Sequence, residues 1–481
     1  MTKRIQLLAT VTLTVIGIAL SPKSQAVVPP PDGGYPGGNT AEGQNALLSL
    51  TTGTFNTAVG LFSLRSNTTG SFNTAIGAGA LFSNFMADQN TATGAGALLF
   101  NESGQENTAY GAFALFSNSS AGFNTAIGAQ ALFSNVSGSG NTAVGDAALK
   151  SNTLGGGNTA VGDGALFFNT EGFQNTAIGS SALASNTVGF ENVAVGGTAL
   201  LFNTEGNFNI AIGLAALYSN TTGTANTAIG LDALYANTVG DDNTAIGFDA
   251  LLRNETGIQN TGVGEEALSG NVSGTSNTAI GFGALANSTG SGSIAIGTDA
   301  GELIGSSNNV IAIGSPGDDV DNTCFIGNIR DVTTQNADAI AVVIDSAGQL
   351  GTMSSSRRYK KEIKPMDKAS EAILALKPVT FHYKSKKMDR PQFGLIAEEV
   401  AEVDPDLVVC DKNGEIYSVR YDQVNAMLLN EFLKEHRSVV ELKKEIAALT
   451  ATVKEQAAQI REVSDQIEMS KAAANVARSH Q

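Results

Sequence analysis

The sequence predicts a mainly β protein: a repetitive β-roll or solenoid of 17-residue units, followed by an α/β domain that ends in a coiled coil. Three observations predict this fold class. An asparagine recurs every 17 residues over about half of the chain, glycine reaches 55 of 481 residues without a Gly-X-Y period, and charge is divided unevenly along the sequence. An unbroken period over this length indicates that each unit stacks on the next. The apolar fraction of 42% argues against general disorder.

Charge divides the chain near residue 350. Residues 27–350 hold 4 basic and 25 acidic side chains, a net charge of −21, whereas residues 351–481 hold 21 basic and 20 acidic ones, a net of +1. The whole chain carries −17, which argues against nucleic acid as a partner. The two parts therefore read as different proteins joined together.

The first residues read as a secretory signal peptide at 1–26. Two basic residues precede the apolar stretch Leu7–Leu20, which is short for a membrane span, and small residues lead to a cleavage site after Ala26. The alternative is an uncleaved membrane anchor. With cleavage, residues 27–38 form a Pro/Gly-rich linker, the mature chain has no transmembrane anchor, and the protein is secreted or held at the cell surface.

The repeat array is expected to span residues 39–314. Fifteen asparagines open the units at 17-residue intervals from Asn39 to Asn277, and the unit reads Asn-Thr-Ala-Ile/Val-Gly-x-x-Ala-Leu-x-x-Asn-Thr-x-Gly-x-x. The Thr-Ala-Ile-Gly segment alternates faces as a short strand does. We expect alanine, leucine and the Ile/Val position to face the core, so that Ile178→Asp would place an unpaired charge there.

The asparagines and glycines of the unit fit turns that need positive φ or a side chain bonded to its own backbone. Asparagines at one register can also bond to each other along the axis. The expected core is small, and thin rungs are best stabilised by association around an axis. We therefore expect a homotrimer.

These units resemble the β-roll heads of trimeric bacterial surface adhesins, whose shorter repeats carry a similar Ala-Ile-Gly step. The resemblance implies a spacer or an adhesive rod, with a cell-surface glycan or receptor as a possible partner. Two other functions remain open for the array. The threonine column could present hydroxyls to ice if it faced solvent, and a polysaccharide-degrading spike would need paired carboxylates in a unique cleft, which the uniform repeats do not suggest.

After a connector at 315–353, residues 354–437 carry the motifs of a second domain. A serine-rich basic turn is followed by an expected helix at 368–376 and a strand at 379–384. Phe393-Gly-Leu-Ile-Ala-Glu-Glu-Val400 then enters another helix. This layout resembles the C-terminal intramolecular chaperone of endosialidase-type phage tail spikes, a self-cleaving trimerisation domain of the peptidase S74 type.

The resemblance assigns roles to individual residues. Ser355 falls on the family's nucleophile, Arg358 on its arginine and Lys360 on its lysine base, while Ser356 stands where the family has aspartate. It implies cleavage between Ser354 and Ser355.

The residues make this chemistry plausible by themselves. A serine needs a base, and Lys360 serves only if it is neutral near pH 7, which burial and the adjacent cations favour. His382 is a candidate for a supporting role. No metal and no cofactor is expected, because Cys324 and Cys410 lack metal-binding spacing.

The terminal region has a heptad repeat that predicts a coiled coil at 438–470, followed by a tail at 471–481. Val439, Ile446, Val453, Ile460 and Ile467 take position a, and Leu442, Leu449, Gln456 and Val463 take position d. β-Branched residues at heptad position a with leucine at position d favour a coiled coil of two helices, whereas the family resemblance implies three helices.

Together these features predict an exported, fibrous surface or tail-fibre-like protein. Its C-terminal domain drives trimerisation and then releases itself, as a single-turnover serine endopeptidase with a Ser-Lys dyad and no external substrate. The alternative is a trimeric surface adhesin that does not cleave itself and keeps its C-terminus.

Overall fold

The computed structural model describes residues 35–335, 338–345, 347–384, 390–411 and 413–478. The chain forms two compact units that meet in sequence between Thr333 and Thr334, and each is described here by itself. The expected signal peptide at 1–26 and most of the linker at 27–38 lie outside the described residues.

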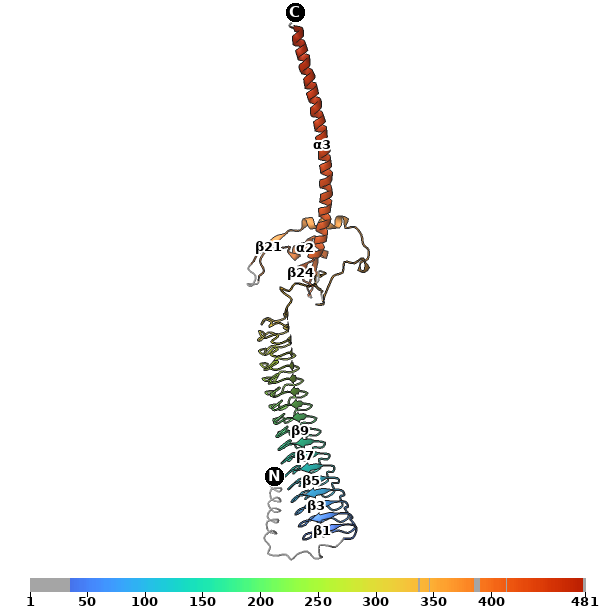
Figure 1. Cartoon of the computed structure of the whole chain (residues 1–481), viewed down its shortest axis with the longest axis vertical. Coiled ribbons are helices and arrows are strands. Elements are labelled where there is room, and N and C mark those ends of the chain that lie inside the picture. The colour runs from blue at the N-terminus through green and yellow to red at the C-terminus, as the bar shows by residue number, and fades with distance from the viewer. Residues whose placement is uncertain (1–34, 336–337, 346, 385–389, 412, 479–481) are drawn as a thin grey trace. The chain divides into compact units, whose positions relative to one another are not determined.

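The first unit is a ladder of 18 short parallel strands, each paired with the next strand along the chain, and Figure 1 shows them as successive rungs. Through most of the array a residue pairs with the residue 17 positions later, as in Thr142 with Thr159. The prediction of a mainly β solenoid with 17-residue rungs is confirmed. The strands are β1 (Thr40–Glu42), β2 (Thr57–Val59), β3 (Thr74–Ile76), β4 (Thr91–Thr93), β5 (Thr108–Tyr110), β6 (Thr125–Ile127), β7 (Thr142–Val144), β8 (Thr159–Val161), β9 (Thr176–Ile178), β10 (Val193–Val195), β11 (Ile210–Ile212), β12 (Thr227–Ile229), β13 (Thr244–Ile246), β14 (Thr261–Val263), β15 (Thr278–Ile280), β16 (Ile294–Ile296), β17 (Ile311–Ile313) and β18 (Cys324–Ile326).

The core of the array closes within one chain. Each rung contributes the central alanine of its strand and the Ala-Leu pair that follows, as in Ala75, Ala80 and Leu81, and all three are fully buried. These residues and their equivalents form one continuous hydrophobic cluster along the ladder. The core is small, as expected, but a single chain completes it.

The Ile/Val position does not face this core, contrary to the sequence analysis. In β9 the central Ala177 is fully buried, whereas Ile178 is 42% exposed. Strand alternation puts the first and third residues on the opposite face from the alanine. The expectation that Ile178→Asp would charge the core is therefore wrong, because the threonine and Ile/Val positions share the outward face of the strand.

Two columns of asparagine occupy the remaining core positions and are fully buried. In the first, the Asn158 amide donates to Asn141 Oδ1 (3.2 Å) and to the Gly172 carbonyl (2.8 Å). In the second, the Asn152 amide donates to Asn135 Oδ1 (2.8 Å). The prediction that asparagines bond to one another along the axis is confirmed, and these ladders satisfy polar groups that would otherwise destabilise the core.

Glycine is required at two places in the rung for different reasons. Gly77 has φ of +133°, and a Cβ there would lie 2.5 Å from the carbonyl oxygen of Gly94 in the next rung. The φ of Gly104 lies outside the left-handed region, but a Cβ there would lie 2.2 Å from the Ala121 carbonyl oxygen. The sequence did not indicate that the core leucines are left-handed, as Leu81 is with φ of 51°.

The regular ladder changes after β15. The unit that opens at Asn277 is one residue short, so that Thr278 pairs with Ile294, and Ser288 stands where the second column needs an asparagine. The buried atoms Asn271 Oδ1 and Ser288 Oγ have no hydrogen-bond partner there. The strands nevertheless continue through β17 to β18, beyond residue 314, where the sequence analysis ended the array.

The second unit is a small α/β domain leading into a long helix. Its elements are β19 (Val343–Ile344), β20 (Leu350–Gly351), the 3₁₀ helices η1 (Arg357–Tyr359), η2 (Asp367–Ala375) and η3 (Pro405–Leu407), β21 (Val379–Phe381), β22 (Gln392–Gly394), α2 (Ala397–Val403), β23 (Val408–Cys410), β24 (Ile416–Val419) and α3 (Tyr421–Arg478). The strands form three antiparallel pairs. Within the described residues, no helix combines the length and the hydrophobicity that a bilayer span requires.

The asparagine ladder generates a test of the rod's stability. Asn158→Ala leaves the buried backbone N–H of Asn175 without its acceptor, the Asn158 side-chain oxygen at 3.0 Å. An orphaned buried donor costs about 1–3 kcal/mol. We expect the variant array to unfold at a lower urea concentration than the wild type, with unfolding measured by far-ultraviolet circular dichroism.

The matched control is Asn287→Ala, because Asn287 is exposed and lies outside both columns. Its midpoint should stay near that of the wild type. Equal losses in the two variants would contradict the structural role of the ladder.

Candidate active site

The predicted cleavage segment is an exposed turn in the second unit. Ser356 precedes η1 and caps it: its hydroxyl accepts hydrogen bonds from the Arg358 backbone N–H (3.4 Å) and Nε (3.3 Å). Serine and aspartate are equally good residues for this capping position. Ser356 thus supplies the cap of η1 at the position where the resemblance implies an aspartate.

Ser355 and Lys360 flank this turn, but the single chain does not join them. Both side chains are exposed, and Lys360 ends η1 with its backbone N–H donating to the Arg357 carbonyl (3.2 Å). Among the hydrogen bonds of the described residues, none links the Ser355 hydroxyl to the Lys360 amine. The burial expected to keep Lys360 neutral is thus not provided by one chain.

The other predicted residues are also exposed. Ser354 lies beside the turn, where its hydroxyl accepts from the Ser356 backbone N–H (3.3 Å). The Arg358 guanidinium lies over the Tyr359 ring, 5.5 Å from its centroid. His382 directly follows β21 and makes no hydrogen bond to Ser355 or Lys360 within the described chain.

A small apolar core supports the domain that carries these residues. Val400 of α2, Leu407 of η3 and Val419 of β24 are buried together with Val424 and Met427 from the first turns of α3. Because α3 contributes to this core, the long helix is fixed to the domain at its base.

A partly buried polar cluster, which we call the Ser370 cluster, also ties η2 to α3. It comprises Ser370, Asn430, Glu431 and Lys434. The Ser370 hydroxyl is fully buried, donates to Glu431 Oε1 and accepts from the Asn430 amide (2.7 Å). Sequence reasoning missed this cluster, because its members lie about 60 residues apart and belong to no motif.

Lys434 Nζ lies 3.4 Å from Ser370 Oγ, so these two residues have the same side-chain types as a catalytic serine-lysine dyad. The pairing of this amine opposes a catalytic role, however. Lys434 also contacts Glu431 (2.7 Å) and Glu371 (3.7 Å), and the Ser370 hydroxyl donates its proton to Glu431 rather than to the Lys434 amine. The Ser370 cluster therefore has a structural role: it holds η2 against α3.

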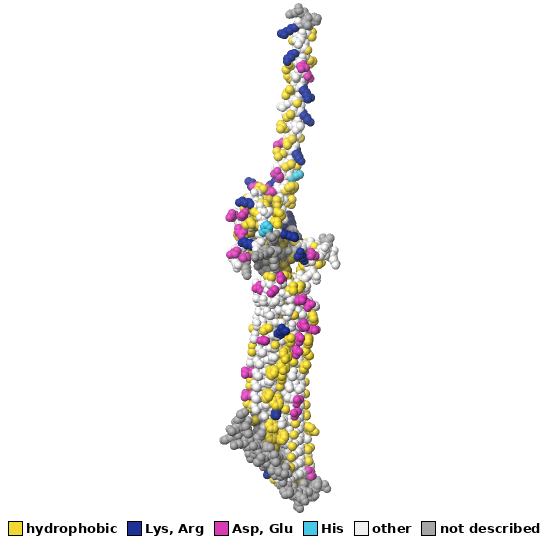
Figure 2. All heavy atoms as spheres, turned by 90° about the vertical axis from the view of Figure 1, so that its left-hand side faces the viewer, with side chains coloured by type: hydrophobic (Ala, Val, Ile, Leu, Met, Phe, Trp, Pro, Cys, Tyr) yellow, Lys and Arg dark blue, Asp and Glu magenta, His cyan; other side chains and the backbone are white. Residues whose placement is uncertain are grey.

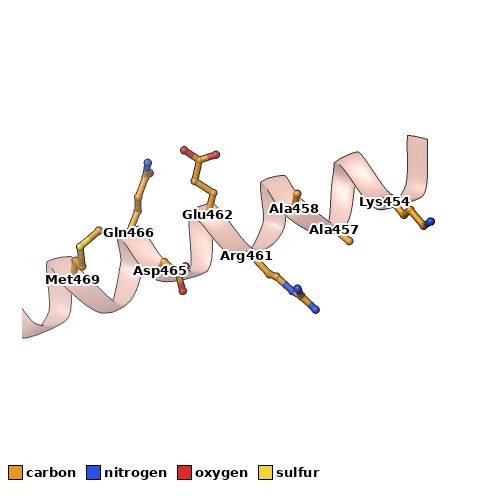
Figure 3. Close-up of a pocket in the computed structure, with 8 residues that line it drawn as sticks. All are labelled: Lys454, Ala457, Ala458, Arg461, Glu462, Asp465, Gln466 and Met469. Carbon is orange, nitrogen blue, oxygen red and sulfur yellow. The ribbon is translucent and has the colours of Figure 1, made fainter. Parts of the chain in front are cut away.

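α3 itself offers no enclosed binding site in its C-terminal half. A shallow hollow there is lined by Lys454, Ala457, Ala458, Arg461, Glu462, Asp465, Gln466 and Met469. Figure 3 shows that these side chains come from one helix and point to different sides of it. Among the described residues, no group of His, Cys, Asp and Glu side chains is arranged to hold a metal ion, and both cysteines are free and exposed.

Comparison with known proteins identifies one family. Residues 355–409 match a peptidase family (S74) described as the chaperone of endosialidase. The match begins at Ser355 and ends within β23, so the resemblance inferred from the sequence is confirmed over these residues. It indicates self-cleaving peptidase-type activity in general. Neither a curated protein nor a solved structure gives a significant match to the chain.

The Ser370 cluster predicts a pH-dependent contribution to stability. Hydrogen bonds from Lys434 and Ser370 lower the pKa of Glu431 from its usual value of 4.5. A carboxyl group with a lowered folded-state pKa stabilises the fold above its unfolded pKa, and this contribution is lost as pH falls through the folded-state value. Glu431→Gln should therefore lower the melting temperature at pH 7, and its difference from wild type should shrink below pH 4.5.

The control for this experiment is Glu435→Gln, one turn further along α3, where the carboxyl is exposed. It should melt with the wild type at both pH values. A difference for Glu431→Gln that stays constant across the acid range would contradict the proposed ionic contribution.

Proposed function

We propose that the protein is an exported, fibrous homotrimer whose C-terminal domain drives assembly and then cuts itself away between Ser354 and Ser355. The observation that carries this proposal is the position of the family match, which starts at Ser355, C-terminal to the solenoid. The described residues between β18 and η1 are almost all exposed. A cut in this connector would separate the two units without opening either core.

The reaction is an acyl shift followed by hydrolysis. Ser355 Oγ attacks the carbonyl carbon of Ser354 as Lys360 accepts the hydroxyl proton, and an ester forms between them. The C–N bond breaks, and the proton passes from Lys360 to the departing Ser355 nitrogen. Water then hydrolyses the ester, which leaves a carboxylate on Ser354 and restores the Ser355 hydroxyl. No external substrate or cofactor is consumed, so each chain turns over once.

Assembly supplies what the single chain lacks. Lys360 is exposed in one chain, where water solvates its side chain beside Arg358 and Lys361. Neighbouring chains packed over the turn would remove that water and favour the neutral amine. Cleavage would therefore wait until three chains have associated.

The helix α3 is the proposed assembly element. Its heptad residues Ile446, Leu449, Val453 and Ile460 are exposed apolar side chains along a 58-residue helix. An uncovered heptad seam of this length is stabilised by other helices of the same kind. Three chains agree with the family resemblance, and the mature rod would act as a surface or tail-fibre-like adhesin with a glycan or receptor as partner.

Self-cleavage is tested by mass spectrometry of the full-length protein. Wild type should yield a fragment that begins at Ser355, while Ser355→Ala should stay intact because the nucleophile is gone. Lys360→Ala should abolish the cut or slow it at least 100-fold, since general base catalysis contributes about 10²–10⁴-fold.

Two neighbouring substitutions are matched controls for the dyad. Ser354→Ala keeps the nucleophile and Lys361→Ala keeps the base, so both should still be cut. An intact wild-type chain, or a new N-terminus at another serine, would contradict the assigned site.

Assembly is tested separately by sedimentation of the uncleaved Ser355→Ala protein, which should be a trimer. Adding Ile446→Asp and Ile460→Asp places charges in the seam and should give monomers. The same two changes in the wild-type background should also suppress cleavage. A folded monomer with an intact seam would contradict the proposed trimer.

A further inference from the structure

The outward face of the parallel sheet is an unusually regular surface. We define the Thr/Ile face as the first and third residues of strands β2 to β18. Its third position holds Ile or Val in thirteen consecutive strands, from Ile127 in β6 to Ile326 in β18. At a strand spacing of about 4.8 Å this column extends over roughly 60 Å. Contiguous apolar surfaces of this extent mark interaction sites.

The Thr/Ile face carries no charge although the array around it is acidic. Residues 57–326 contain 20 acidic and 3 basic side chains, and none of them occupies the first or third position of a strand. Figure 2 shows hydrophobic side chains of the array gathered in lengthwise stripes. Two copies of this acidic rod repel each other through most of their surface. They can approach most closely through the Thr/Ile face.

The threonines of this face are free to bond to a partner. Threonines in the turn after the second asparagine use their hydroxyls within the chain, as Thr153 does in donating to the Thr170 carbonyl (3.0 Å). Among the described residues, the threonines that begin the strands make no such intramolecular hydrogen bond. Their hydroxyls remain available beside the Ile/Val column.

The period of the face limits what can cover it. A partner that packs side chain against side chain along the whole column must repeat at the spacing of one rung. A second copy of the array meets this requirement, because its rungs have the same spacing and follow in the same order.

The proposed cleavage adds an independent requirement. Once α3 is cut away, the array loses the element that holds the copies together. A rod that stays assembled after the cut therefore needs an interface on the N-terminal side of Ser355.

We propose that the Thr/Ile face is this interface: copies of the array pack in parallel through it, with equal rungs at equal heights. The inference rests on the proposed assembly and identifies its partner surface. The Ile/Val columns form the dry centre of the contact, and the threonine hydroxyls bond across it.

Disulfide trapping in the full chain tests the proposal. Cys324 lies on the Thr/Ile face at β18, so Cys324→Ser and Cys410→Ser provide the background. A disulfide forms only where two Cα atoms come within about 7 Å. Ile178→Cys should give covalent dimers on oxidation, because equal rungs meet there. Val188→Cys, in the same unit but in the turn after the second asparagine, should not; Ile178 is 42% and Val188 44% exposed.

A charge-insertion pair provides a second measurement on the released rod. Ile178→Lys with Ile246→Lys places like charges inside the proposed contact, and the cleaved array should sediment as a monomer. Val188→Lys with Val239→Lys adds the same charge at positions of similar exposure, 44% and 47%, and should leave the rod assembled. Circular dichroism identifies any variant that fails to fold.

The outcomes separate this proposal from the function on which it rests. Covalent dimers through Ile178→Cys in a chain that never cleaves support the face and contradict only the peptidase assignment. An oligomer in which Val188→Cys crosslinks as well as Ile178→Cys, or in which neither does, overturns the face while assembly stands. A monomeric wild type overturns both. A monomer with thermal hysteresis that is lost in Ile178→Lys with Ile246→Lys would assign the face to ice instead.

Discussion

Two columns of buried asparagine amides fix the geometry on which the array depends. Through most of both columns an amide donates to the asparagine one rung away and to a backbone carbonyl, and a regular rung length keeps these partners in register. A polar group buried without its partners is costly. The 17-residue period is thus enforced by hydrogen bonding as much as by apolar packing. The loss of one amide illustrates the constraint, because Ser288 replaces an asparagine of the second column and leaves Asn271 Oδ1 and Ser288 Oγ unpaired.

The same constraint explains where the larger apolar side chains lie. Two asparagines, two alanines and one leucine fill the interior of a rung, and the tight approach of Gly77 to the next rung leaves no room for more. Isoleucine and valine at the third strand position are therefore placed outside. A hydrophobic column on the surface is a direct consequence of a polar column in the core.

Much of the fold could be predicted from the sequence, because periodicity determines rung length, strand position and the alignment of the asparagines. The face on which Ile178 lies could not be predicted in this way. Alternation separates Ala177 from its two neighbours but does not say which side is buried, and hydrophobicity alone favoured the wrong answer. The buried amides decide it, since Asn175 precedes the strand with its side chain in the core.

The candidate site shows a second limit of sequence reasoning. The spacing of Ser355 and Lys360 follows from a local motif, and the family match begins at the first of them. The Ser370 cluster joins residues about 60 positions apart and has no local pattern, so only the packed structure reveals it.

Both units of the chain leave surfaces exposed that identical chains could cover. The array leaves its Ile/Val column uncovered, α3 leaves its heptad seam uncovered, and the turn at Lys360 remains in water. Under the proposed function, each of these features would change once identical chains associate. If the seam assembles first, it raises the local concentration of the long sheet faces, whose pairing then no longer needs the seam. A peptide bond that is cut only in the assembled state would make this order of events irreversible, because the separated domain cannot return the rod to free chains.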